Sequence, residues 1–257
     1  MLLRLIEVVG AQSISVFNIF GQTSLFLLKT LYTMATTPLK VRKLFEQMRM
    51  IGVDSLSIIL LTGVFSGAVL ALQTYIGFKR FGAEEFIGPV VALSLIRELG
   101  PVLTGLMVTG RAGSSLAAEL GTMEITEQID ALKTLCIDIY QYLMVPRVLG
   151  ATLILPFLTL FSMFFGILGG YWVCVYVLHL NGEQYISGIK TFVEFSDITG
   201  GLIKSAVFGL IFSWIGCYKG FYTSGGAKGV GIATTKSVVI SSIMILIANY
   251  FLTALLF

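Results

Sequence analysis

Charged residues are scarce in this sequence, and the shortage excludes an ordinary water-soluble domain. Lys, Arg, Asp and Glu together make up 12% of the 257 residues, whereas hydrophobic residues make up 56%. The mean hydropathy is +0.92. A soluble domain has about 25% charged residues, so this chain has too little polar surface to cover a globule in water. The composition therefore predicts an integral membrane protein.

Histidine and cysteine are also scarce, which disfavours catalysis and metal binding. Cys136, Cys174 and Cys217 follow no metal-ligand or disulfide spacing. The single histidine, His179, lies at a predicted span end, far in sequence from the "GVFSG" stretch around Ser66. An intramembrane serine hydrolase is therefore a disfavoured alternative. We expect no catalytic residue, no metal and no other cofactor.

A phosphate-binding loop is also missing from the sequence. The glycine-rich stretch "GGAKGVG" at 225–231 lacks the Gly-Lys-Ser/Thr ending of a P-loop, and we interpret it as a flexible turn. The net charge of +3 does not indicate nucleic-acid binding. If this protein uses ATP, another chain must hydrolyse it.

Long apolar runs predict five transmembrane helices. A span needs about 20 mostly apolar residues, and the segments that qualify are 53–78, 87–110, 148–178, 199–217 and 237–257. A further segment, 13–35, places Asn18, Gln22 and Lys29 on one helical face, which favours an interfacial or re-entrant helix over a sixth span. The N-terminal residues lack a clear signal-peptide pattern, so we expect no cleavable signal peptide. The expected fold is one all-α membrane domain over 1–257, with an N-terminal segment 1–52 and a five-span core 53–257.

Basic residues predict the orientation of the spans. Segments 36–52, 111–147 and 218–236 hold ten Lys and Arg residues, whereas the alternate loops 79–86 and 179–198 hold three. Cytoplasmic loops carry the excess of basic residues. The ten-cation side is therefore predicted to be cytoplasmic, and the C-terminal Phe257 to lie outside.

Two adjacent ions, Arg97 and Glu98, stand inside the second span, just before Gly100-Pro101. A charged side chain at the bilayer centre costs about 3 kcal/mol on insertion scales. Neighbouring residues point about 100° apart on a helix, so each ion can pair with a different helix. Lys204 is the natural partner of Glu98. A static clamp and a lining for polar headgroups both remain open.

Two further patterns have both a structural and a functional interpretation. In 124–135 the apolar residues Ile125, Ile129, Leu132 and Leu135 recur at helical spacing, with Thr126 as a candidate cap. This helix could dock a soluble partner or simply rest on the membrane. Likewise, the stripe of Leu70, Thr74, Phe78 and Phe81 could line a site or only pack; Leu246 is interpreted as lipid-facing.

Four motifs in order resemble the MlaE/YrbE family of ABC-transporter permeases, over about residues 20–257. They are "RELGPVLTGLMVTGRAGSSLAAELGTMEITEQIDAL", "MVPRVLGATLILP", "GLIKSAVFG" and "GGAKGVGIATTKSVV". The resemblance implies an inner-membrane homodimer in a Gram-negative-type bacterium, with a periplasmic C-terminus. It implies a cytoplasmic ABC ATPase, a periplasmic MCE-domain protein and, in many systems, a STAS-domain protein bound to the ATPase. The implied activity is ATP-driven movement of phospholipid between the inner membrane and an MCE conduit, which maintains outer-membrane lipid asymmetry.

The resemblance also implies roles for particular residues. The segment 111–147 would contain a cytoplasmic coupling helix that contacts the ATPase through Glu124, Glu127, Ile129, Asp130 and Leu132. A charged network of Arg97, Glu98 and Lys204 would lie close to a lipid pocket. The lipid-binding candidates are Leu70, Thr74, Phe78, Phe81 and Leu99.

The sequence departs from the family pattern at three places. "CIDI" at 136–139 replaces a "GVDP"-like turn, Asn249 replaces a residue that is acidic in many members, and Gln22 replaces a common arginine. A permease or channel for another hydrophobic or small solute is the alternative function. The spans contain few polar side chains, so a bulky amphiphile suits them better. Transport direction and headgroup preference stay open.

Overall fold

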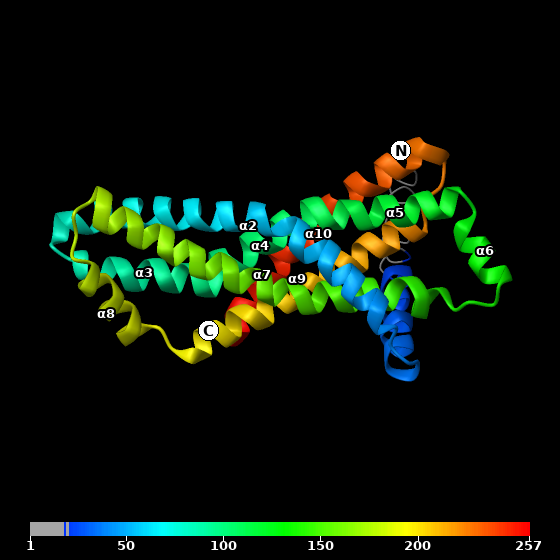
Figure 1. Ribbon diagram of the computed structural model, residues 1–257, viewed down its shortest axis with the longest axis horizontal. Helices are drawn as coiled ribbons and strands as arrows, with labels where there is room; N and C mark the ends of the chain where they lie inside the picture. Colours follow the sequence, from blue (N-terminus) through cyan, green and yellow to red (C-terminus); the bar gives the residue numbers. More distant parts are fainter. Residues whose placement is uncertain (1–17, 19–20) are drawn as a thin grey trace, which may run out of the picture.

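The structure is a computed structural model that describes residue 18 and residues 21–257, and this part of the chain is helical without strands. Its five helical segments long and apolar enough to cross a membrane are Val41–Phe81, Glu84–Ile125, Tyr140–Val177, Phe195–Phe221 and Gly226–Leu256. Figure 1 shows them running along the long axis of one bundle. The predicted all-α fold with five spans is confirmed.

Several spans are built from more than one helical element. The first contains α2 (Val41–Phe78) and the 3-10 turn Lys79–Phe81. The second contains the 3-10 turn Glu84–Phe86, α3 (Ile87–Ser94), the π-helical turn Leu95–Leu99, α4 (Gly100–Val108), the π-helical turn Thr109–Gly113 and α5 (Ser114–Ile125). The third contains the π-helical turn Tyr140–Met144, α7 (Val145–Trp172) and the π-helical turn Val173–Val177. The last two are α9 (Phe195–Phe221) and α10 (Gly226–Leu256), while α6 (Gln128–Thr134) and α8 (Gly182–Phe192) lie between spans.

The helices extend well beyond the predicted apolar segments. Residues 41–52, 111–125 and 226–236 were predicted as polar loop segments, but they belong to α2, to the second span and to α10. The predicted boundary at residues 52 and 53 therefore falls inside a helix. Helix α2 has 38 residues, and at a rise of about 1.5 Å per residue it is much longer than the hydrocarbon layer, which is about 30 Å thick. Its polar end can stay helical outside the apolar layer, where no hydrophobic run marks it.

The N-terminal described segment is a helix over residues 21–36 that lies across the long axis of the bundle (Figure 1). Phe26 is buried and packs against the rings of Tyr140, Tyr218 and Phe221. The Trp214 indole donates a hydrogen bond of 2.9 Å to the Thr23 carbonyl. This crosswise orientation agrees with an interfacial helix rather than a sixth span. Most of 13–20 lies outside the described residues.

Glycines bring the first and third spans close together. A Cβ atom on Gly67 of α2 would collide with the Gly166 carbonyl of α7, and one on Gly169 would collide with the Val64 carbonyl. Small residues allow this backbone approach in membrane proteins. Beyond them, the main core joins all five spans through Ile59, Val108, Leu155, Phe208, Phe212 and Ile245.

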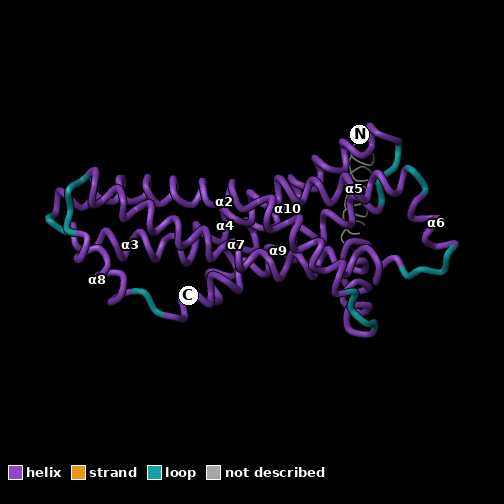
Figure 2. Tube along the Cα trace, viewed as in Figure 1, coloured by secondary structure: helices purple, strands orange, loops and turns teal. Residues whose placement is uncertain are grey.

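The connections gather at the two ends of the bundle (Figure 2). Helix 21–36, α6 and the turn between α9 and α10 lie at one end, and α8 lies at the other (Figure 1). The first end holds most of the basic residues and is the end predicted to be cytoplasmic.

Candidate functional site

The centre of the site is the π-helical turn Leu95–Leu99 and the proline that follows it. In a regular helix the residue at 101 would donate its N–H to the Arg97 carbonyl, but Pro101 has no N–H. The Lys204 ammonium donates to this carbonyl oxygen instead, at 2.9 Å. The Gly-Pro break therefore provides an acceptor for a buried cation.

Lys204 of α9 is fully buried, with 0% of its side chain exposed. Besides the Arg97 carbonyl, its ammonium donates to Glu98 Oε1 at 2.8 Å and to Thr253 Oγ1 at 2.7 Å. An ammonium has three donors, and all three are used. The structure thus contains the predicted contact between Glu98 and Lys204.

Glu98 also binds α10, which the sequence did not indicate. Asn249 Nδ2 donates to Glu98 Oε2 at 2.9 Å, and Thr253 Oγ1 donates to Glu98 Oε1 at 2.8 Å. Asn249 and Thr253 are four residues apart, so they share a helical face. The amide therefore hydrogen-bonds Glu98 at the position where many MlaE/YrbE sequences carry an acid, and the charge centre joins three spans.

Arg97 points to a different partner, Asp197 in the first turn of α9. Its Nη2 and Nε lie 2.7 Å and 2.8 Å from Asp197 Oδ1. The Asp197 side chain also accepts from the Glu194 backbone N–H at 3.0 Å and completes a capping box at the start of α9. The sequence analysis missed Asp197, although an acid three residues after Glu194, before an apolar run, is typical of a helix start.

A pocket of about 370 Å³ adjoins Glu98, lined also by Leu246, Asn249, Tyr250, Thr253 and Ala254. The lining combines the polar Glu98, Asn249 and Thr253 with the apolar side chains of Leu246, Tyr250 and Ala254, so it can accept an amphiphile. Leu246, interpreted from the sequence as lipid-facing, is 52% exposed and also lines this pocket.

The five lipid-binding candidates do not line this pocket within the described chain. Leu70, Phe78 and Leu99 are half-buried and pack against one core cluster, which includes Ala71 and Leu95. Thr74 bonds its hydroxyl to the Leu70 carbonyl of its own helix at 2.7 Å. Phe81 lies beyond the end of α2 in a 3-10 turn, so the predicted helical stripe ends at Phe78, and Phe81 is 83% exposed.

The predicted coupling helix 124–135 is shorter than expected. Glu124 and Ile125 belong to the end of α5, and α6 covers only Gln128–Thr134. Glu127 separates the two helices with a φ of 58°, in the left-handed region. The Thr126 hydroxyl bonds back to the Thr122 carbonyl at 2.7 Å and does not cap α6. Helical periodicity alone could not detect this single-residue break.

The side chains of α6 divide into a buried face and an exposed face. Ile129 is 0% exposed and Leu132 is half-buried in the same cluster, so Ile129 is not the surface anchor we expected. Glu127 and Asp130 are exposed. Asp130 binds the Lys133 ammonium at 2.7 Å, and this hydrogen bond raises the pKa of Lys133.

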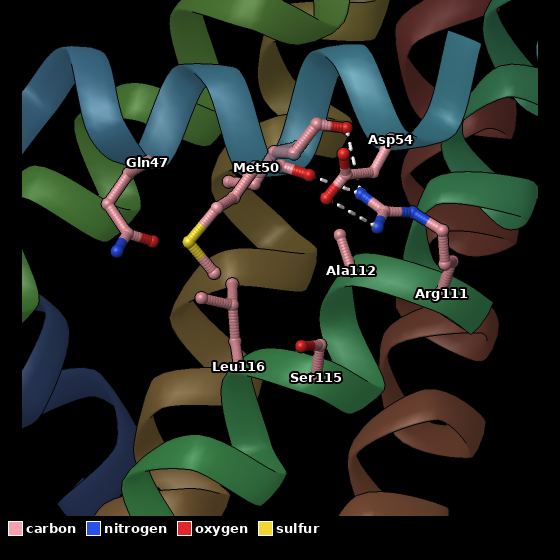
Figure 3. Close-up of a pocket in the computed structure, with 8 residues that line it drawn as sticks. Gln47, Met50, Asp54, Arg111, Ala112, Ser115 and Leu116 are labelled. Atoms are coloured by element: carbon pink, nitrogen blue, oxygen red, sulfur yellow. Dashed lines mark hydrogen bonds and ion pairs between the residues drawn. The ribbon is translucent and has the colours of Figure 1, made fainter.

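Two arginines that the sequence analysis interpreted as loop residues are bonded between helices. Arg147 of α7 is 4% exposed, and its Nη2 lies 2.6 Å from Glu119 Oε1 of α5. Arg111 reaches α2, where it donates to the Met50 and Ile51 carbonyls at 2.6 Å and 3.0 Å (Figure 3). These partners could not be predicted from the sequence, because Arg111 and Arg147 lie at the boundaries of a predicted loop.

Together, the fold and the site define a multi-pass helical membrane protein with a charge centre shared by three spans. Ions at membrane depth typically mark a transport pathway or a functional site. The model of the permease MlaE family matches residues 44–255, and the chain belongs to this family. It is therefore a transporter permease subunit rather than a catalytic enzyme.

Relatives match along most of the chain. A probable ABC transporter permease protein of Rickettsia bellii is 48% identical over 257 residues, which cover 100% of this chain and 99% of the relative. The intermembrane phospholipid transport system permease protein MlaE of Haemophilus influenzae is 36% identical over 258 residues, covering 100% and 99%. The chloroplastic protein TRIGALACTOSYLDIACYLGLYCEROL 1 of Arabidopsis thaliana is 41% identical over 216 residues, covering 84% and 62%.

Proposed function

We propose that this chain is the membrane-spanning permease of an ATP-driven phospholipid transport system. The observation that carries the proposal is the buried Glu98–Lys204 pair beside a pocket of apolar side chains. Such a pocket offers polar groups to a headgroup and apolar contact to acyl chains. The name of the Haemophilus influenzae relative supports phospholipid as the substrate.

The chain acts in this proposal as a homodimer in the inner membrane of a Gram-negative-type bacterium. A cytoplasmic ABC ATPase supplies the energy, since the sequence has no P-loop of its own. An MCE-domain protein receives or delivers lipid on the periplasmic side, where the C-terminus would lie, and a STAS-domain protein would bind the ATPase. Transport between the inner membrane and the MCE conduit would maintain the lipid asymmetry of the outer membrane.

The ATPase would contact the exposed face of α6 and the adjoining end of α5. Glu127 and Asp130 are exposed there, and Glu124 lies half-buried at the end of α5. These acids suit a basic groove, while Ile129 and Leu132 hold α6 on the bundle. Reversal of the exposed charges should therefore weaken the contact without unfolding α6.

The lipid pathway would connect the Glu98 pocket with the stripe of Leu70, Thr74, Phe78, Phe81 and Leu99. The exposed Phe81 and the half-buried Leu99 would be its outermost and innermost members, respectively. A permease for a small hydrophilic solute is the less supported alternative, because the pocket also has apolar lining from Leu246, Tyr250 and Ala254 and the stripe is mostly Leu and Phe.

The test is ATP-dependent transfer of labelled phospholipid by the permease reconstituted with its ATPase. Glu98→Gln should lower transfer at least several-fold, and Asp130→Lys should lower both ATPase binding and transfer. Lys190→Glu, a charge reversal in α8 at the opposite end, is the matched control. Transfer that needs neither ATP nor Glu98 would overturn the proposal.

A photo-crosslinking residue separately maps the pathway. Placed at Leu70, Phe78, Phe81, Leu99 or Leu246, it should capture phospholipid in cells. Leu153 of α7, which is 43% exposed, is the membrane-facing control. Capture at the five positions no stronger than at Leu153 would remove them from the pathway.

A further inference from the structure

A second cavity lies at the α6 end of the bundle, away from Glu98, and we call it the vestibule. It measures about 350 Å³ and lies between α2, α5, the π-helical turn Tyr140–Met144 and α7. Figure 1 shows α2 and α5 diverging toward this end. Its polar lining residues are Lys43, Glu46, Gln47, Glu119, Tyr142 and Arg147.

Arg111 bridges the gap deeper in the bundle, where α2 and the second span approach each other. Its guanidinium binds the Met50 carbonyl and Ser55, and Nη1 lies 3.6 Å from Asp54. Figure 3 shows Arg111 reaching α2, with Gln47 and Ser115 farther along the same gap. Arg111 therefore ties α2 to the second span next to the vestibule.

Two residues that line the vestibule, Arg147 and Glu119, carry buried polar atoms of opposite charge that have no hydrogen-bond partner in the described part of the chain. Arg147 uses Nη1 on the Leu143 carbonyl and Nη2 on Glu119 Oε1. Its Nε has no hydrogen-bond partner, and neither has Glu119 Oε2. Gln47, which faces the same cavity, also has an unpartnered amide oxygen. Buried polar groups ordinarily have a hydrogen-bond partner. The Arg147 donor and the Glu119 acceptor are exceptions that a bound ligand could satisfy.

The charges around the vestibule balance. Lys43 and Arg147 carry positive charge, and Glu46 and Glu119 carry negative charge. The Lys43 ammonium lies 3.2 Å from the centre of the Tyr142 ring. An anionic ligand would leave excess negative charge in this cavity, and a cationic ligand would leave excess positive charge. A dipolar ligand matches both unmet groups without a net charge.

We propose that the vestibule binds the headgroup of a zwitterionic phospholipid that carries a primary ammonium. The phosphate would accept from Lys43 and Arg147, and the ammonium would donate to Glu119 and Gln47. A small rotation of the Glu119 carboxylate turns Oε2 into the cavity, because the last torsion of glutamate is broad. Met50, Met123 and Leu143 supply apolar contact for the glycerol and the first methylenes.

This site is distinct from the Glu98 pocket, and only its choice of a phospholipid rests on the proposed function. The two ends of the α6 segment, Met123 before it and Tyr142 after it, both line the vestibule. A bound headgroup would therefore contact both flanks of the segment proposed to meet the ATPase, together with α2. Binding of a headgroup in the vestibule would therefore affect the position of α6.

The test uses the full-length protein in nanodiscs that contain equal amounts of phosphatidylethanolamine, phosphatidylcholine and phosphatidylglycerol. A photo-crosslinking residue at Met123 captures vestibule lipid, which mass spectrometry identifies. We expect about tenfold more phosphatidylethanolamine than phosphatidylcholine, since a quaternary ammonium cannot donate the charge-assisted hydrogen bond to Glu119. Equal capture of the three lipids by the wild-type protein would overturn the inference.

Two variants assign the preference to particular side chains. Glu119→Gln should abolish the discrimination between the two zwitterionic lipids, and Lys43→Gln should reduce capture of both several-fold. Glu183→Gln in α8 and Arg49→Gln on the exposed side of α2 are the controls for lost charge. A preference that survives Glu119→Gln in a folded protein would reject the site. Should Glu119→Gln not fold, Lys43→Gln and the wild-type competition decide.

The results separate this inference from the proposed function. Phosphatidylethanolamine capture at Met123 without ATP-driven transfer would reject the transport proposal alone. ATP-driven transfer with no lipid preference at Met123 would reject the vestibule site alone.

Discussion

Two ion pairs with a buried cation, Glu98–Lys204 and Glu119–Arg147, differ in how completely the hydrogen bonds of their ions are satisfied. Both cations are buried, with 0% of the Lys204 side chain and 5% of the Arg147 side chain exposed. Lys204 uses all three of its donors on protein acceptors. Arg147 leaves Nε without a partner, and Glu119 leaves Oε2 without one.

The difference separates a clamp from a binding site. In the Glu98 centre only the Asn249 amide oxygen lacks a partner among the described residues, and both ions are fully bonded. A buried ion pair whose bonds are made fixes the helices that contribute to it, whereas an unmet charged group costs free energy until it gains a partner. The Glu98 centre therefore sets the arrangement of three spans beside its pocket. The Glu119 centre holds fewer elements and leaves hydrogen-bonding capacity for a ligand.

The largest effect should come from Glu98→Ala. The substitution leaves the Lys204 ammonium buried without its counter-ion, which typically costs about 3–5 kcal/mol. Unfolding in detergent, followed by circular dichroism, measures the loss. The double variant Glu98→Lys with Lys204→Glu should recover part of the stability, and purely additive damage would contradict the pairing.

Glu119→Ala should cost less, about 1–3 kcal/mol, through the unpaired Arg147 guanidinium. Because the Glu119 side chain is 39% exposed and borders the vestibule, water can reach the guanidinium and replace the lost carboxylate. The same unfolding experiment gives the comparison. A loss equal to that of Glu98→Ala would show that the two pairs are equivalent.

Arg111→Met should cost about 1–2 kcal/mol, because the Met50 and Ile51 carbonyls lose a charged donor. It should also widen the gap between α2 and the second span. A cysteine introduced at Gln47 should then react faster with a water-soluble thiol reagent than in the parent protein. Arg80→Met, in the exposed turn after α2, is the control and should leave that rate unchanged.

The smallest effect, a gain in stability, is expected from Cys136→Gly. Cys136 has a φ of 55°, a conformation that costs a non-glycine residue about 1–2 kcal/mol. Glycine removes that cost but adds unfolded-state entropy of about 0.5–1 kcal/mol, so the net gain should be roughly 0.5–1 kcal/mol. Cys136→Ala is the control, and a gain of equal size there would contradict the role of the backbone angle.

The turn after α6 shows how family departures can be absorbed. "CIDI" lacks the glycine and proline of the family pattern, yet Cys136 adopts the left-handed conformation that suits a glycine. Asp138 then accepts from the Tyr140 backbone N–H at 2.8 Å and orders the start of the third span. The conformation of this turn could not be predicted from the sequence, because backbone angles depend on the surrounding packing.

The five spans were predictable because each contains an apolar run of membrane length. Their ends were not, since the polar turns of α2 at 41–52 are helical without a hydrophobic signal. The break at Glu127 was missed because the apolar periodicity continues across it, from Ile125 to Ile129.

By itself, the sequence determined the membrane class, the five spans and the presence of ions at membrane depth. It also determined that the carbonyl of Arg97 would lack its usual helical donor, because Pro101 has no N–H. Only the tertiary structure decided that Lys204 donates to this carbonyl and that Asp197 pairs with Arg97. It also decided that Asn249 and Thr253 donate to Glu98. These choices depend on the rotation of α9 and α10 about their axes, which the packing of whole helices fixes and no local pattern records.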